Sequence, residues 1–161
     1  MKGKIIGTIC LLAFFAMIYS CQSDASIEYS RYYSAGAVVY HDHCRNCHGD
    51  KGEGLNGLIP PLTDTAFLKS NKAKLAYQLK NGLKDKITVG AKAFDGTMPA
   101  SGLSPIEMAQ VITYVTNSFG NKQGVVTGDE VETALKECNS IEFIILVAKS
   151  YHLWAHIRVF Y

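Results

Sequence analysis

The sequence contains no second Cys-x-x-Cys pair and no visible internal repeat. A closed structural zinc site takes four Cys or His ligands, so the missing second pair argues against that kind of metal centre. A thioredoxin-like redox pair normally accompanies a βαβ pattern, which the sequence does not show. Zinc binding and dithiol redox chemistry are therefore the less favoured interpretations of the one cysteine pair that is present.

The chain also lacks an apolar run of the ~20 residues that a membrane-spanning helix needs. The nearly unbroken apolar stretch over residues 5–18 follows two lysines and precedes a small residue and Cys21. This order is typical of a secretory signal, and its ending resembles a bacterial lipoprotein box. We predict a signal peptide over 1–20, an acylated Cys21 and a lipidated tether over 21–26. An ordinary signal peptide and an uncleaved anchor remain alternatives.

This segment sets the expected location of the mature chain. An acylated Cys21 places the protein on the periplasmic side of a bacterial membrane, as an exported, membrane-anchored lipoprotein. Loss of the signal peptide also removes Lys2 and Lys4 and leaves 14 basic against 14 acidic residues, from 16 and 14 in the whole chain. We expect no nucleic-acid partner for the mature chain.

The pentapeptide Cys44-Arg45-Asn46-Cys47-His48 is the attachment signature of a c-type haem. Two thiols three positions apart on one helical turn can add to the two vinyl groups of a single porphyrin. His48, the next residue, then offers a ring nitrogen as the proximal iron ligand. The sequence therefore predicts one covalent haem c, bound through Cys44 and Cys47.

Met98 is the predicted second axial ligand of the iron. Met108 falls on the apolar stripe of an expected helix and is assigned to the core, whereas Met98 stands in a Gly-Thr-Met-Pro loop segment placed by its backbone. His41 and His43 precede Cys44 on the same expected helix and are interpreted as surface or haem-edge residues. A His/Met site raises the reduction potential and suits electron transfer.

Four helices are expected in the mature chain. Apolar periodicity, capping patterns and glycine stops place them at 27–44, 72–81, from Pro105 to a stop at Gly120, and from Thr127 to about Glu137. Residues 87–103 read as an irregular loop because glycine and proline recur there. No firm role is assigned to 139–161, for which a surface amphipathic helix and a poorly ordered extension are both open.

Lysine is concentrated in one segment. Between Lys69 and Lys92 there are seven lysines and one acid, Asp85. The simpler interpretation is a solvated helix face. The other is a positive docking surface that steers an acidic redox partner.

With these residues in place, the chain resembles the class I cytochrome c family over about 27–138. The matches are Gly36, Tyr40 and Cys44 at four-residue spacing, and Val111 and Tyr114 on the helix expected to cross them. The resemblance implies an all-α fold, a small helical bundle wrapped around one covalently attached haem. It also implies that the Pro60 carbonyl accepts a hydrogen bond from His48 and that Leu62 packs on the haem.

The resemblance further implies a single-electron carrier in a periplasmic or membrane-associated redox chain, with redox proteins as partners. We expect neither an enzyme nor a small-molecule substrate. The alternatives are a haem subunit of a larger oxidoreductase and, less favoured, a gas-binding or peroxidase-like haem protein. Cys138 is the one cysteine left over in the mature chain, and we interpret it as an inert thiol.

Overall fold

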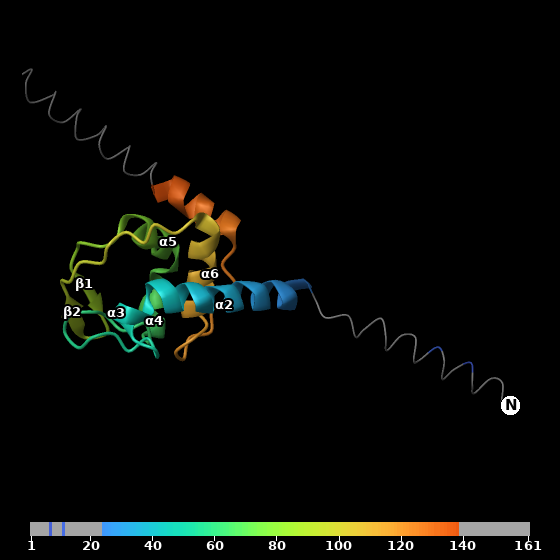
Figure 1. The fold of residues 1–161 in the computed structure, drawn as a ribbon, viewed down its shortest axis with the longest axis horizontal. Coiled ribbons are helices and arrows are strands. Elements are labelled where there is room, and N and C mark those ends of the chain that lie inside the picture. Colours follow the sequence, from blue (N-terminus) through green and yellow to red (C-terminus); the bar gives the residue numbers. More distant parts are fainter. Residues whose placement is uncertain (1–6, 8–10, 12–23, 139–161) are drawn as a thin grey trace, which may run out of the picture.

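The computed structural model describes residues 24–138, together with positions 7 and 11 (Figure 1). Apart from those two positions, the predicted signal peptide, Cys21 and the extension 139–161 lie outside the described residues. The elements are α2 (Asp24–His43), α3 (Arg45–His48), α4 (Thr65–Ser70), α5 (Lys72–Asn81), β1 (Ile87–Val89), β2 (Lys92–Phe94) and α6 (Pro105–Val115). Residues 128–138 form a further helical segment. The predicted all-α class is confirmed.

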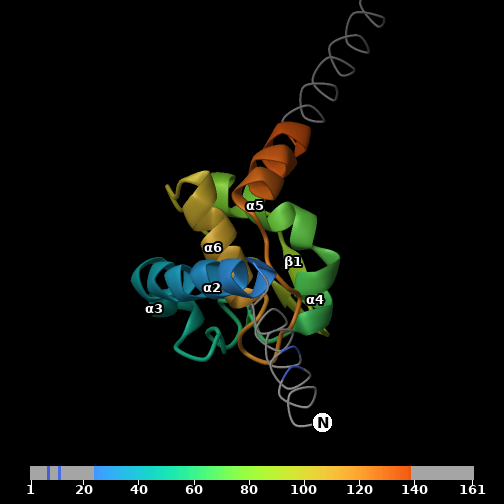
Figure 2. The same ribbon diagram turned by 90° about the vertical axis from the view of Figure 1, so that its right-hand side faces the viewer.

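Helices α2 and α6 cross at the centre of the fold, as both views show (Figures 1 and 2). Gly36 makes the crossing close, since a Cβ at this position would lie 2.0 Å from the Gln110 carbonyl oxygen. Val111 is 2% exposed, and the Tyr40 and Tyr114 rings lie 5.3 Å apart. The predicted glycine and aromatic crossing is therefore confirmed.

Helix α2 begins at Asp24, three positions before the predicted start. Asp24 lies in the first turn, where its negative charge interacts favourably with the helix dipole and stabilises the helix. The Ser30 hydroxyl donates a hydrogen bond to the Ser26 carbonyl, one turn earlier. Residues 24–26, assigned to the tether from their polar composition, are thus helical. Their polar composition therefore does not interrupt the helix, in which Asp24 and Ala25 are exposed and Ser26 is half-buried.

Helix α6 starts as predicted and ends earlier than predicted. Ser104 and Glu107 form the expected capping box. The helix ends at Val115 instead of running to Gly120, because asparagine side chains bind carbonyls of its last turn in place of backbone amides. The Asn117 side-chain amide donates to the Thr113 carbonyl at 2.7 Å, and that of Asn121 donates to the Val115 carbonyl at 3.0 Å. Phe119, expected on the helical stripe, has a φ of 57° outside the helix.

A short β-hairpin replaces part of the predicted irregular loop. Strands β1 and β2 pair antiparallel with Ile87 opposite Phe94, around a turn at Gly90. Helix α4 was also not predicted, and the Asp64 carboxylate caps it by accepting from the Phe67 amide at 2.8 Å. Helix α5 has the predicted bounds, and the second predicted capping box forms between Thr127 and Glu130.

The core lies between α2, α5, α6 and the helical segment 128–138. Its buried residues are Tyr40, Ala76, Leu103, Met108, Ala109, Val111, Ile112, Val126, Val131 and Leu135. Met108 is 3% exposed, which confirms its predicted place in the core. None of the helices in residues 24–138 has both the length and the apolarity to cross a bilayer.

Candidate haem site

The Cys-x-x-Cys-His segment forms a tight helical turn at the end of α2. Cys44 links α2 to α3, and its carbonyl accepts from the amides of Cys47 at 3.1 Å and His48 at 2.9 Å. Neither cysteine forms a disulfide within residues 24–138; Cys44 is half-buried and Cys47 is exposed. The backbone therefore places both sulfurs and the imidazole on one turn at the edge of the core.

The imidazole of His48 is fixed by a second loop. Its Nδ1 lies 3.2 Å from the Pro60 carbonyl oxygen, so Nδ1–H donates and Nε2 is the nitrogen left for a metal. Burial lowers the pKa of His48, while the bond to Pro60 acts in the opposite direction. The predicted hydrogen bond is confirmed, and it orients a neutral imidazole of the kind that iron binds.

Loop 49–54 joins His48 to the Pro60 segment. The Gly54 amide donates to the His48 carbonyl at 2.8 Å, and the Leu62 amide donates to the Gly52 carbonyl at 2.7 Å. Leu62 is half-buried and packs against the core. His48, Pro60 and Leu62 consequently belong to one hydrogen-bonded unit.

Met98 belongs to a different unit of the structure. Its amide donates to the Leu83 carbonyl at 2.8 Å, and its carbonyl accepts from the Leu83 amide at 2.9 Å. Gly82, at φ 77°, allows this approach, since a Cβ there would lie 2.5 Å from the Met98 carbonyl oxygen. Met98 is half-buried, and these backbone hydrogen bonds fix its place in the loop.

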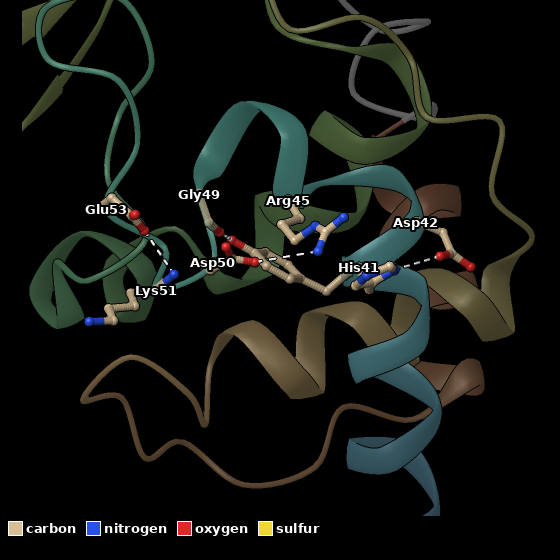
Figure 3. Close-up of polar contacts among 8 residues, drawn as sticks. His41, Asp42, Arg45, Gly49, Asp50, Lys51 and Glu53 are labelled. Atoms are coloured by element: carbon tan, nitrogen blue, oxygen red, sulfur yellow. Dashed lines mark hydrogen bonds and ion pairs between the residues drawn. The ribbon is translucent and has the colours of Figure 1, made fainter.

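The polar residues around the turn contact one another in pairs (Figure 3). His41 and His43 are exposed, and the His41 Nδ1 pairs with the Asp42 carboxylate at 2.9 Å. This agrees with their interpretation as surface residues. Arg45 and Asp50 form an ion pair at 3.6 Å, and the Glu53 carboxylate accepts from the Lys51 amide at 2.8 Å.

The chemistry of the donor set fits haem c better than zinc or a dithiol redox centre. Within residues 24–138, no three His, Cys, Asp or Glu side chains are grouped closely enough to hold a metal ion. Burial and then the neighbouring Cys47 raise the pKa of the Cys44 thiol to about 11, whereas redox-active cysteine pairs have a lowered pKa. Two thiols, one imidazole and one thioether match the groups that attach and ligate a c-type haem.

Sequence reasoning missed two contacts in this region. The Tyr40 hydroxyl donates to the Gly49 carbonyl at 2.6 Å, and the Phe119 ring lies against the backbone of Gly52. The glycine-rich composition of 49–57 signals close approach by another group. It does not identify that group, because Phe119 is 67 positions away in the chain.

Comparison with known proteins places the chain in a family. The cytochrome c family model matches residues 33–118, about half of the chain. Cytochrome c-552 of Thermus thermophilus is 27% identical over 95 residues, covering 56% of this chain and 72% of the relative. The cytochrome c subunit of the quinone alcohol dehydrogenase of Gluconobacter oxydans is 29% identical over 104 residues, which is 62% of this chain and 21% of that subunit.

The fold, the cysteine–histidine turn and these matches agree with one another. The chain belongs to the cytochrome c family and is a haem-binding electron-transfer protein.

Proposed function

We propose that the protein is a monohaem electron carrier in which Cys44 and Cys47 form the two thioether bonds and His48 and Met98 are the axial iron ligands. Bound haem c supplies a one-electron ferric/ferrous couple. The observation that carries the proposal is the hydrogen bond from His48 Nδ1 to the Pro60 carbonyl, directly after the cysteine pair. It holds Nε2 free and keeps the ring in one orientation.

This proposal assigns transport rather than catalysis to the protein. With both axial positions taken by His48 and Met98, oxygen, peroxide or carbon monoxide has no open coordination site. We expect the ferrous holoprotein to bind carbon monoxide far more slowly than its Met98→Ala variant, as measured by stopped-flow absorption. Rapid binding by the unmodified protein would instead support a gas-binding or peroxidase-like function.

A second candidate function is a subunit of a larger oxidoreductase. The similarity to a cytochrome c subunit of a quinone alcohol dehydrogenase supports it. The roles of His48 and Met98 are the same in both cases, and only the partner differs. Co-purification of the native protein from its membrane separates the two, since a permanent subunit stays with its dehydrogenase in detergent and a mobile carrier does not.

We further propose that the chain is exported and anchored by lipid at Cys21, because residues 1–21 have the order of a lipoprotein signal. Helix α2 starts at Asp24, so the tether between the lipid and the folded domain is shorter than the predicted 21–26. The unmodified protein should sediment with membranes, and Cys21→Ser should leave it soluble or unprocessed. Membrane association of Cys21→Ser after cleavage of residues 1–20 would argue against the anchor.

The lysine segment is proposed as a docking surface for an acidic partner. Within residues 24–138, none of its lysines forms an ion pair, and all except Lys72 are exposed. Lys84 follows Leu83, which pairs with Met98, so the segment borders the proposed ligand. Positive charge at this position would accelerate the approach of an anionic partner.

Neutralising part of this surface should slow reduction of an anionic oxidant. For Lys84→Ala combined with Lys86→Ala, we expect the rate with hexacyanoferrate(III) at low salt to fall by up to about tenfold, with a weaker dependence on ionic strength. Lys122→Ala, an exposed lysine outside the segment, is the matched control. Equal effects of the two changes would favour a merely solvated face.

A further inference from the structure

Two aromatic residues far apart in the chain hold loop 49–54, the loop that follows His48. The first is Tyr40 on α2, which is 3% exposed. Its hydroxyl donates to the Gly49 carbonyl at 2.6 Å, one residue after His48. Its ring lies 5.3 Å from each of the Tyr114 and Phe119 rings. The hydroxyl is thus fixed in place by the packing of its ring against two other aromatic rings.

The second is Phe119, which follows α6. A Cβ at Gly52 would lie 2.6 Å from Cδ2 of the Phe119 ring, so the ring touches the loop backbone directly. Phe119 has a φ of 57°, a left-handed conformation that is unfavourable for a bulky side chain. Its ring also packs edge-on against Tyr114 at 5.8 Å. This packing holds the residue in a backbone conformation that it would not adopt alone.

The clamped loop in turn holds both partners of the imidazole hydrogen bond. Gly52, under Phe119, accepts from the Leu62 amide at 2.7 Å, two residues after Pro60. Gly49, under Tyr40, is the neighbour of His48, whose own carbonyl accepts from Gly54. The position of the loop therefore sets the distance between His48 Nδ1 and the Pro60 carbonyl.

We propose that Tyr40 and Phe119 are positioning residues for His48, which clamp loop 49–54 and thereby keep the imidazole hydrogen-bonded to Pro60. This inference rests on the proposed function, in which His48 is an axial ligand. A well-formed hydrogen bond at Nδ1 makes the imidazole a stronger donor to iron and favours the ferric state. Loosening the clamp should therefore raise the reduction potential.

The test compares two tyrosines of the same helix in the haem-loaded protein. Tyr40→Phe removes only the hydroxyl that binds Gly49. Tyr32→Phe is the matched control, because the Tyr32 hydroxyl accepts from the Gly128 amide at 3.3 Å, away from the loop and from Phe119. For Tyr40→Phe we expect a higher midpoint potential. We also expect hydrogen exchange at His48 Nδ1, followed by NMR, to quicken about fivefold, as for the loss of one ordinary hydrogen bond. Tyr32→Phe should change neither.

Phe119→Leu is the second variant, and it should shift both quantities in the same direction even if Tyr40→Phe proves too unstable to load with haem. The inference is overturned if potential and exchange stay at the parent values in every variant that folds, or if Tyr32→Phe shifts them equally. The proposed function fails separately, in the unmodified protein, if the NMR signals of His48 show no paramagnetic shift from bound iron. The inference then falls with it.

Discussion

Replacing Met98 by leucine is expected to lower the reduction potential by on the order of 0.1 V or more, within the roughly 0.8 V range that axial ligands set. A thioether is a weak, soft donor that favours ferrous iron, and leucine offers no donor at all. Leucine also has nearly the same volume, so packing changes little. The backbone pairing of Met98 with Leu83 does not involve the side chain and should persist.

Met108→Leu is the matched control for this change. Met108 lies in the core at 3% exposure and has no ligand role in the proposal. We expect it to leave the potential unchanged and to cost less than about 1.5 kcal/mol of stability. Potentiometric titration and the methionine–iron charge-transfer absorption give the two readouts. An unaltered absorption spectrum and potential in Met98→Leu would refute the ligand assignment.

The second large effect is expected for Gly36→Ala at the crossing of α2 and α6. The added Cβ would lie 2.0 Å from the Gln110 carbonyl oxygen, 2.6 Å from its carbonyl carbon and 2.8 Å from Tyr114 Cβ. Because two of these atoms are backbone, a rotamer change cannot relieve the clash, and the helices must separate. We expect a loss of about 3 kcal/mol of unfolding free energy. For the domain over residues 24–138 this corresponds to a fall in Tm of roughly 12 °C.

Gly128→Ala provides the comparison that isolates this clash. A Cβ at Gly128 would lie 3.6 Å from Ile106 Cδ1, an ordinary contact, and the residue opens a helical segment. Since alanine is the better helix former, thermal unfolding should occur at the same temperature or slightly higher. Equal Tm values for the two variants would show that the crossing does not require glycine at 36.

The local features of the site could be predicted from sequence because each depends on a few neighbouring residues. The spacing of Cys44, Cys47 and His48 fixes them on one turn. The capping box at Ser104 needs only Glu107, three residues later. The acceptor for His48 came from a family resemblance, since nothing local connects His48 with Pro60.

The features that were missed depend on distant contacts or on very short elements. Strands β1 and β2 have three residues each, too few for a periodic pattern to stand out from loop composition. Phe119 continues the apolar spacing of α6, and only the capping of the last carbonyls by Asn117 and Asn121 ends the helix before it. The clamp on loop 49–54 joins three separate segments and leaves no local signal.

The most direct test of the account is whether the mature protein carries a covalently attached haem. The exported protein should be purified, denatured, extracted with acidic organic solvent and weighed by mass spectrometry. We predict a polypeptide mass increased by one haem, a visible absorption that stays with the chain, and no free thiol at Cys44 or Cys47. A colourless chain in which both cysteines react with a thiol reagent would contradict the account.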